Sequence, residues 1–275
     1  MNYIRRTIGK EKPLVRVLPL IGTIRAGRGG KNVSITNIEK QIEQSFECKR
    51  AQPKAVVLEI NSNGGSAVQS NLIYQRIRNL SDKTKVPVIS YVQDAAVSGG
   101  YWLALAGDEI YADPNSAVGS VGVISLLFGL EGVIKKLGIE PRILTAGKHK
   151  MRINPFEAQN PEDTEWMKSF IDEVHENFKT LVKERRKSLD KEHKTVFEAD
   201  VFTGEKAAKL GLIDGTTSDI HALLKTRFGE DVVIKRVEGK SMFPFGFGKY
   251  GTEVKLNTDN VFDNLADAQS RYKIF

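Results

Sequence analysis

The chain has 275 residues, of which 40% are hydrophobic and 27% are charged, and it carries one cysteine and a net charge of +7. This length allows one large α/β domain or two small ones. The single Cys48 excludes an intramolecular disulfide and a zinc site built from cysteines. The basic residues are scattered, without interleaved aromatic residues or a nucleic-acid-binding motif, so we expect no nucleic-acid partner.

The sequence predicts no metal centre, no cofactor site and no membrane span. The four histidines have no metal-ligand spacing, and no GxGxxG motif follows the first predicted strand. Residues 117–130 form the nearest approach to an apolar span, but they are shorter than the roughly 18 residues required and are broken by glycines. Residues 1–6 are basic and lack the apolar core of a secretory signal, so none is expected.

Strands and helices alternate along the first half of the chain. Apolar positions 35, 38, 42 and 46 are spaced by three and four, which predicts a helix over 35–46. The alternation indicates βαβ units with parallel strands, and therefore functional loops at the carboxyl ends of the strands, here at 61–66 and 95–100. The predicted strands of this half are 14–24, 54–60 and 86–92, with a further helix beginning after 61–66.

The second half continues with shorter elements and one long helix. Asn160 and Pro161 suit the cap and first turn of that helix. Its predicted buried stripe consists of Trp166, Met167, Phe170, Val174, Phe178 and Leu181. The other predicted elements are a helix over 102–106, strands over 109–112 and 142–145, a helix over 130–137, and a short capped helix followed by a strand within 203–214. Beyond residue 239 the periodicity fades.

The segment Asp94–Tyr101 places one serine, Ser98, at a glycine-rich corner between a predicted strand and a predicted helix. A helix start leaves N–H groups unpaired and carries a partial positive charge, and both stabilise an alkoxide or oxyanion. Ser98 is therefore a candidate nucleophile. Serine is also a common helix cap, and the segment alone leaves both interpretations open.

A nucleophilic serine needs a base and an oxyanion hole. Lys148 and Lys150 lie in a loop after a predicted strand, and a lysine serves as a base where burial favours its neutral form, although both also fit a solvated basic loop. Gly64 and Gly65 would either donate an N–H to an oxyanion or form a tight turn. Ser120 would either hold a lysine amine or cap a turn.

The order of these motifs resembles the S49 peptidases, the signal peptide peptidase A and SohB-like family, over roughly residues 14–220. The resemblance implies an α/β chain with a ClpP/crotonase-like fold of repeated ββα-type units. It implies one main peptidase domain over 14–238, preceded by an N-terminal segment (1–13) and followed by a C-terminal arm (239–275). The motifs that carry it are 60–66, 94–101, 106–113, 118–123, 145–156 and 203–214.

The resemblance also implies roles for individual residues. By motif position Ser98 is the nucleophile of a Ser-Lys dyad, and Lys150 is its general base. The amides of the oxyanion hole fall on Gly65 and Gly99, with Gly64 and Ser120 in supporting roles. No metal or cofactor is implied.

The function implied is a serine endopeptidase that hydrolyses hydrophobic or membrane-derived peptides, such as cleaved signal peptides. Family members with one such domain form rings or domes, so we expect a homo-oligomer whose dyad is shared between subunits and which works close to a membrane. Two features depart from the family: Asn63 replaces the usual proline, and the usual membrane anchor is missing. The alternatives are a crotonase-type acyl-CoA enzyme and a non-catalytic scaffold of the same fold.

Overall fold

The structure is a computed structural model that describes residues 12–27, 32–47, 52–190, 193 and 195–238. The predicted C-terminal arm over 239–275, the first eleven residues of the N-terminal segment and Cys48 lie outside these ranges. Within the described residues, no helix combines the length and the hydropathy that crossing a bilayer requires.

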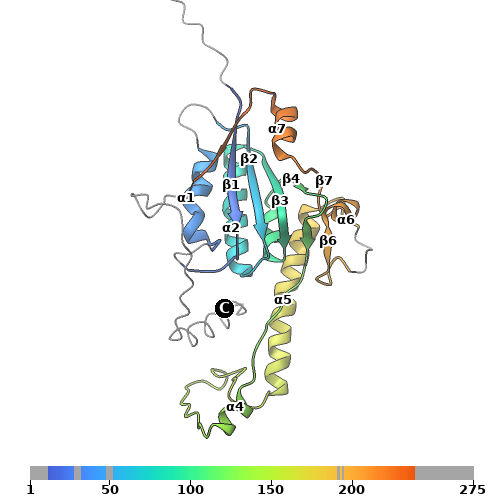
Figure 1. Cartoon of the computed structure of the whole chain (residues 1–275). Helices are drawn as coiled ribbons and strands as arrows, with labels where there is room; N and C mark the ends of the chain where they lie inside the picture. Colours follow the sequence, from blue (N-terminus) through green and yellow to red (C-terminus); the bar gives the residue numbers. More distant parts are fainter. Residues whose placement is uncertain (1–11, 28–31, 48–51, 191–192, 194, 239–275) are drawn as a thin grey trace, which may run out of the picture.

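The centre of the molecule is a mixed sheet of eight described strands in the order β6-β5-β3-β2-β1-β8, with β4 pairing β3 and β7 pairing β4 (Figure 1). All pairs are parallel except β5 with β6. The strand β3 pairs with β4 along its first half and with β5 along its last three residues. The strands are β1 (Leu14–Ile21), β2 (Ala55–Ser62), β3 (Val88–Val97), β4 (Glu109–Ala112), β5 (Ala117–Gly119), β6 (Val201–Thr203), β7 (Gly215–Thr216) and β8 (Val233–Arg236).

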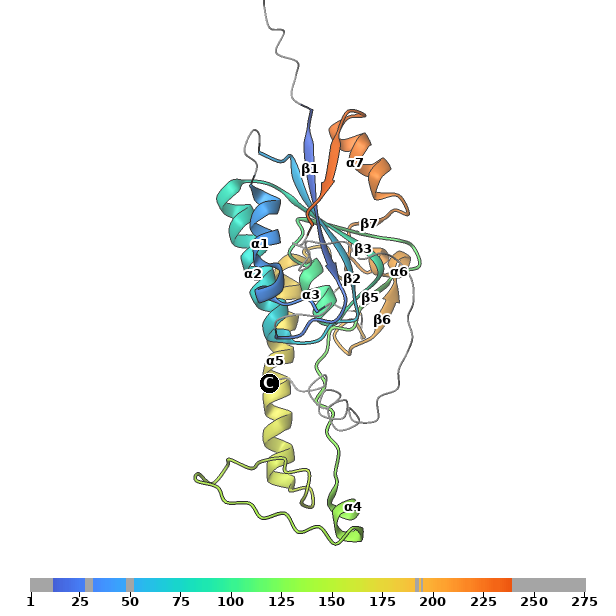
Figure 2. The ribbon, with the colours of Figure 1, turned by 60° about the vertical axis from the view of Figure 1, so that its left-hand side comes forward.

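Helices cover both faces of the sheet (Figure 2). On one face lies the larger buried cluster, to which α1, α2, α3 and the end of α5 contribute, and on the other α7 packs over a smaller one. This burial on two faces explains why the central strands read as nearly continuous apolar runs. The helices are α1 (Ile35–Phe46), α2 (Ala67–Thr84), α3 (Gly99–Ala104), α4 (Glu131–Lys136), α5 (Pro161–Arg185), α6 (Gly204–Lys209) and α7 (Ile220–Phe228).

One long excursion leaves this body between β5 and the end of α5. We call residues 122–177 the projection; none of them is buried, whereas Val121 before it and Phe178 after it are. The projection carries α4 and most of α5 away from the sheet (Figure 1). It therefore has no hydrophobic core of its own.

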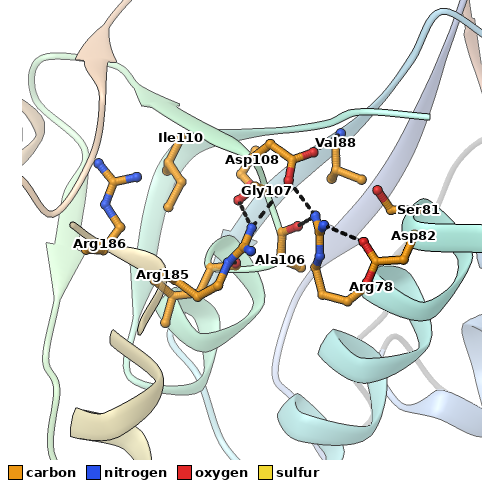
Figure 3. Close-up of polar contacts among 12 residues, drawn as sticks. Arg78, Ser81, Asp82, Val88, Ala106, Gly107, Asp108, Ile110, Arg185 and Arg186 are labelled. Carbon is orange, nitrogen blue, oxygen red and sulfur yellow. Dashed lines mark hydrogen bonds and ion pairs between the residues drawn. The ribbon is translucent and has the colours of Figure 1, made fainter. Parts of the chain in front are cut away.

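The base of α5 is fixed to the body by two arginines. The guanidinium of Arg185 donates to the carbonyl oxygens of Leu105 (2.9 Å) and Gly107 (2.8 Å), and it lies 3.4 Å from Asp108, which Arg78 of α2 also binds at 2.7 Å (Figure 3). The buried Arg186 binds Asp214 at 2.8 Å and the carbonyl of Gly211 at 3.0 Å. Together these bonds hold α5 to the turn between α3 and β4 and to the segment before β7.

The α/β class and the parallel pairing of consecutive strands are confirmed, and three local predictions differ from the structure. Residues 142–145 form no strand, because they lie on the projection, where no neighbouring strand pairs with them. Of the predicted stripe on α5 only Phe178 and Leu181 are buried, because the first part of that helix stands clear of the sheet. Strand β3 also runs five residues further than predicted, to Val97, and brings Ser98 directly to the start of α3.

Candidate active site

Ser98 occupies the sharp turn between β3 and α3. Its backbone has φ 52° and ψ −125°, a conformation that non-glycine residues rarely adopt and that persists only when the surroundings enforce it. The N–H of Ser98 donates to the carbonyl of Gly119 (2.9 Å), which ties the turn to the end of β5. A strained strand-to-helix turn of this kind presents the nucleophilic serine of α/β-hydrolases.

The hydroxyl of Ser98 is not used as a helix cap. Ser98 holds the N-cap position of α3, but its side chain accepts no capping hydrogen bond. By contrast, the side chains of Ser34 and Ser66 accept from the N–H groups of Asn37 and Gln69, at the starts of α1 and α2. Ser98 therefore does not cap α3 through its side chain.

The turn from β2 to α2 packs directly against Ser98. A Cβ atom built on Gly64 would lie 2.8 Å from the nitrogen of Gly99 and 2.9 Å from the Cβ of Ser98, so only glycine allows this approach. The residues that follow β1 brace the turn from its other side: the N–H of Ile24 donates to the carbonyl of Gly64 (2.9 Å), and the N–H of Ser66 donates to the carbonyl of Ile24 (2.8 Å). A side chain on Gly65, whose φ is 139°, would collide with that same carbonyl.

The turn that carries Gly65 packs against the start of α3, where Gly99 follows Ser98. A Cβ atom on Gly99 would lie 3.3 Å from the nitrogen of Gly65, so the two backbones are in contact. Gly99 is the first residue of α3, where a backbone N–H has no partner within the helix. The bridge between Ile24 and Gly65 is made by the carbonyl of Gly64 and the N–H of Ser66, so the N–H of Gly65 takes no part in it. Among the described residues, neither N–H donates a hydrogen bond. A pair of adjacent, unused donors suits an oxyanion.

Ser120 lies immediately after β5, whose last residue, Gly119, pairs with Val97. Its φ is 53°, again unusual for a residue other than glycine, and its N–H donates to the carbonyl of Asp200 (2.7 Å). The fold thus brings Ser98, Ser120 and the Gly64–Gly65 turn together from separate elements.

Lys150 is not brought to Ser98 within the single chain. It belongs to the segment between α4 and α5, and this segment lies at the end of the projection that is remote from the sheet (Figures 1 and 2). Its backbone N–H donates to the carbonyl of Gly147 (3.1 Å), and Lys148 and His149 beside it are exposed as well. The candidate nucleophile and the candidate oxyanion-hole glycines therefore lie in one place in the described chain, and the predicted base lies in another.

The helix behind Ser98 is anchored through aromatic side chains that sequence reasoning did not single out. The hydroxyl of Tyr101 donates to the carbonyl of Leu212 (2.7 Å), and burial raises the pKa of this phenol, so it stays protonated. The ring of Trp102 stacks on Phe178 of α5 with the centroids 4.7 Å apart. The aromatic pair Tyr101-Trp102 directly after Gly99-Gly100 was the available clue, since large rings rarely follow a turn unless they pack.

The helix that follows the Gly64–Gly65 turn exposes apolar side chains. Val68 and Leu72 lie one turn apart on α2, just after Gly65, and are 58% and 43% exposed. The apolar residues that this helix buries are Ile73, Tyr74 and Ile77. This end of α2 therefore presents an apolar surface.

Two family models match the chain. The model described as Peptidase family S49 matches residues 81–232, more than half of the chain and all of β3, α3 and the projection. The model described as NfeD1b, N-terminal domain, matches residues 31–128, which include both glycine-rich turns.

Curated relatives include proteins of different sizes. The Na(+)/H(+) antiporter NhaA of Brucella abortus (strain 2308) is 41% identical over 235 residues, 85% of this chain and 31% of that protein. The chloroplastic serine protease SPPA of Arabidopsis thaliana is 32% identical over 58% of this chain and 24% of its own length. The chain thus spans about a third or less of these two relatives. Among solved structures, the 1510-N membrane-bound stomatin-specific protease in complex with a substrate peptide is 20% identical, with coverages of 83% and 93% and a TM-score of 0.48.

Proposed function

The chain belongs to peptidase family S49, and on this premise we propose that it is a serine endopeptidase with Ser98 as its nucleophile. The observation that carries the proposal is the geometry of Ser98. Its turn is strained, its hydroxyl caps no helix, and the N–H groups of Gly65 and Gly99 lie beside it. Strain of this kind is stored at functional sites.

The proposed reaction is acyl transfer in two steps. A neutral lysine amine takes the proton of the Ser98 hydroxyl while the oxygen attacks the peptide carbonyl, and the N–H groups of Gly65 and Gly99 hold the oxyanion that forms. The C–N bond then breaks as the ammonium returns its proton to the leaving amine. Water, deprotonated by the same amine, hydrolyses the acyl-enzyme and regenerates Ser98.

We assign the role of the base to Lys150 from a second copy of the chain. In one chain Lys150 is exposed and lies on the projection, so desolvation of its amine, which favours the neutral form of a lysine, has to come from an additional surface. The projection also exposes many large apolar side chains, among them Ile124, Phe128, Leu137 and Leu144. Covering these side chains would favour assembly, since burial of apolar area drives most protein association.

The proposed substrates are hydrophobic or membrane-derived peptides, such as cleaved signal peptides. Val68 and Leu72 support this choice because they expose an apolar surface on α2, the helix that follows the Gly64–Gly65 turn. Val68→Asp should raise KM for an apolar peptide more than for a polar peptide of equal length. An equal change for both peptides would contradict the assignment of these side chains to substrate binding.

A fluorophosphonate probe tests the nucleophile. It should label the full chain on Ser98 and inactivate it, and Ser98→Ala should abolish both labelling and peptide cleavage. Ser169→Ala, which removes an exposed serine of α5, is the matched control and should behave as the wild type does. Cleavage that survives in Ser98→Ala would refute the proposed nucleophile.

Complementation tests whether the dyad is shared. Ser98→Ala and Lys150→Ala should each be inactive alone. Co-expressed in equal amounts, they should recover about a quarter of the wild-type activity, because a site works only when its serine and its lysine come from the appropriate two variants across a head-to-tail interface. No recovery in a mixed assembly would overturn the shared dyad.

A further inference from the structure

The turn that carries Ser120 is held at three points. The N–H of Ser120 donates to the carbonyl of Asp200 (2.7 Å), and the N–H of Gly122 donates to the carbonyl of Ser120 (2.9 Å). The side chain of the intervening Val121 is fully buried. The third point is the carbonyl of Val121, which faces α5 and lies 2.9 Å from the Nε2 atom of His175.

His175 is the donor in this contact, because a carbonyl oxygen can only accept. The imidazole therefore carries a hydrogen on Nε2, as either its neutral tautomer or its protonated form does. The side chain is half-buried and lies at the base of the projection, one turn before Phe178, which stacks on Trp102 of α3. His175 thus joins the helix of the projection to the residue that follows Ser120.

We propose that His175 is a positioning residue that holds the hydroxyl of Ser120 in place for catalysis. The inference rests on the proposed function and on the place of Ser120, which directly follows Gly119, the residue whose carbonyl accepts from the N–H of Ser98 (2.9 Å). The backbone of Ser120 has an unfavourable positive φ, so the turn keeps this shape only while its neighbours enforce it. Loss of the contact with the Val121 carbonyl frees the turn to relax, and the Ser120 side chain then moves relative to Ser98.

The first test separates catalysis from binding. His175→Ala should lower kcat by roughly three- to tenfold, the effect of one hydrogen bond, and leave KM unchanged. His175→Gln should restore most of kcat, because its amide N–H can reach the same carbonyl. His221→Ala, which removes an exposed histidine of α7, is the matched control. Failure of glutamine to rescue kcat would contradict the hydrogen-bond role.

A double-mutant cycle with Ser120→Ala decides whether His175 acts through Ser120. If it does, His175→Ala should have no further effect on kcat in the Ser120→Ala background. Independent effects that multiply would overturn the inference. Thermal unfolding of all four proteins, run alongside, detects a variant that fails to fold. An inactive wild-type chain would instead overturn the proposed function, so the two failures are distinguishable.

Discussion

The body and the projection of this molecule differ in what stabilises them. In the body, two apolar clusters are buried on opposite faces of the sheet. In residues 122–177 no side chain is buried, although leucine, isoleucine and phenylalanine are frequent there. The body therefore accounts for its own folding, whereas the projection depends on its attachment at the base of α5 and on any surface that covers it. An apolar composition in the sequence is therefore not enough to identify a hydrophobic core.

The largest difference should be seen between an aromatic residue of the body and a leucine of the projection. Phe178→Ala removes a buried ring that stacks on Trp102, so the free energy of unfolding should fall by about 3–5 kcal/mol. Leu144→Ala, at a position that is fully exposed, should change it by less than about 0.5 kcal/mol. Urea denaturation of both variants measures this. Equal losses would show that the projection has a core after all.

A smaller difference is expected for arginines in the two regions. Arg185→Ala removes hydrogen bonds to two carbonyls at the base of α5 and should cost about 1–3 kcal/mol (Figure 3). Arg142→Ala removes an exposed pair with Glu140 on the projection, 3.5 Å apart, and should cost at most about 0.5 kcal/mol. The same denaturation experiment applies. A larger cost at Arg142 would invert the comparison.

The smallest effect concerns pH. Hydrogen bonds from Arg227 (2.6 Å) and Tyr111 (2.9 Å) hold the pKa of the Glu109 carboxyl below its ordinary value of 4.5. A carboxyl with a lowered pKa in the folded state stabilises the protein above pH 4.5, and that stability is lost as the pH falls through the folded value. Glu109→Gln should therefore cost less than about 1 kcal/mol at pH 7, and the difference from the wild type should shrink as the pH falls below 4.5.

Unfolding curves between pH 3 and pH 7 check this prediction. Glu131→Gln breaks the exposed pair with Lys135 on the projection, 2.6 Å apart, and serves as the matched control. We expect its stability to follow that of the wild type across this range. If the curves of Glu109→Gln and the wild type stay parallel down to pH 3, the contacts of Glu109 with Arg227 and Tyr111 do not stabilise the fold.

Local patterns predicted most of the body. The spacing of apolar residues gave α1 its observed bounds, Ile35–Phe46, and Asn160 caps α5 through a bond from the N–H of Glu162. The α/β class is confirmed, together with the ClpP/crotonase-like fold that family S49 implies. These features depend on neighbours in the sequence or on the order of elements, and both can be read from the chain.

Predictions failed where the outcome depends on distant partners. Residues 142–145 have the composition of a strand but lack a strand to pair with, and Trp166 suits a buried stripe but lies on the part of α5 that leaves the sheet. For the site, the sequence left Ser98 open as a nucleophile or as a cap, and the structure shows that its side chain accepts no capping hydrogen bond. The roles of Ser98 and Lys150 stay predictions that the variants above test.

Because the described residues attach α5 to the body only at its C-terminal end, a small tilt there moves its other end by a much larger distance. From Phe178 back to Pro161 the helix runs about 26 Å at 1.5 Å per residue, so a tilt of about 10° at its base sweeps the far end by roughly 4–5 Å. The bonds of Arg185 and Arg186 and the ring of Phe178 resist that tilt. Side chains at the base of α5 thus determine the position of groups at the far end of the projection, although they do not contact those groups.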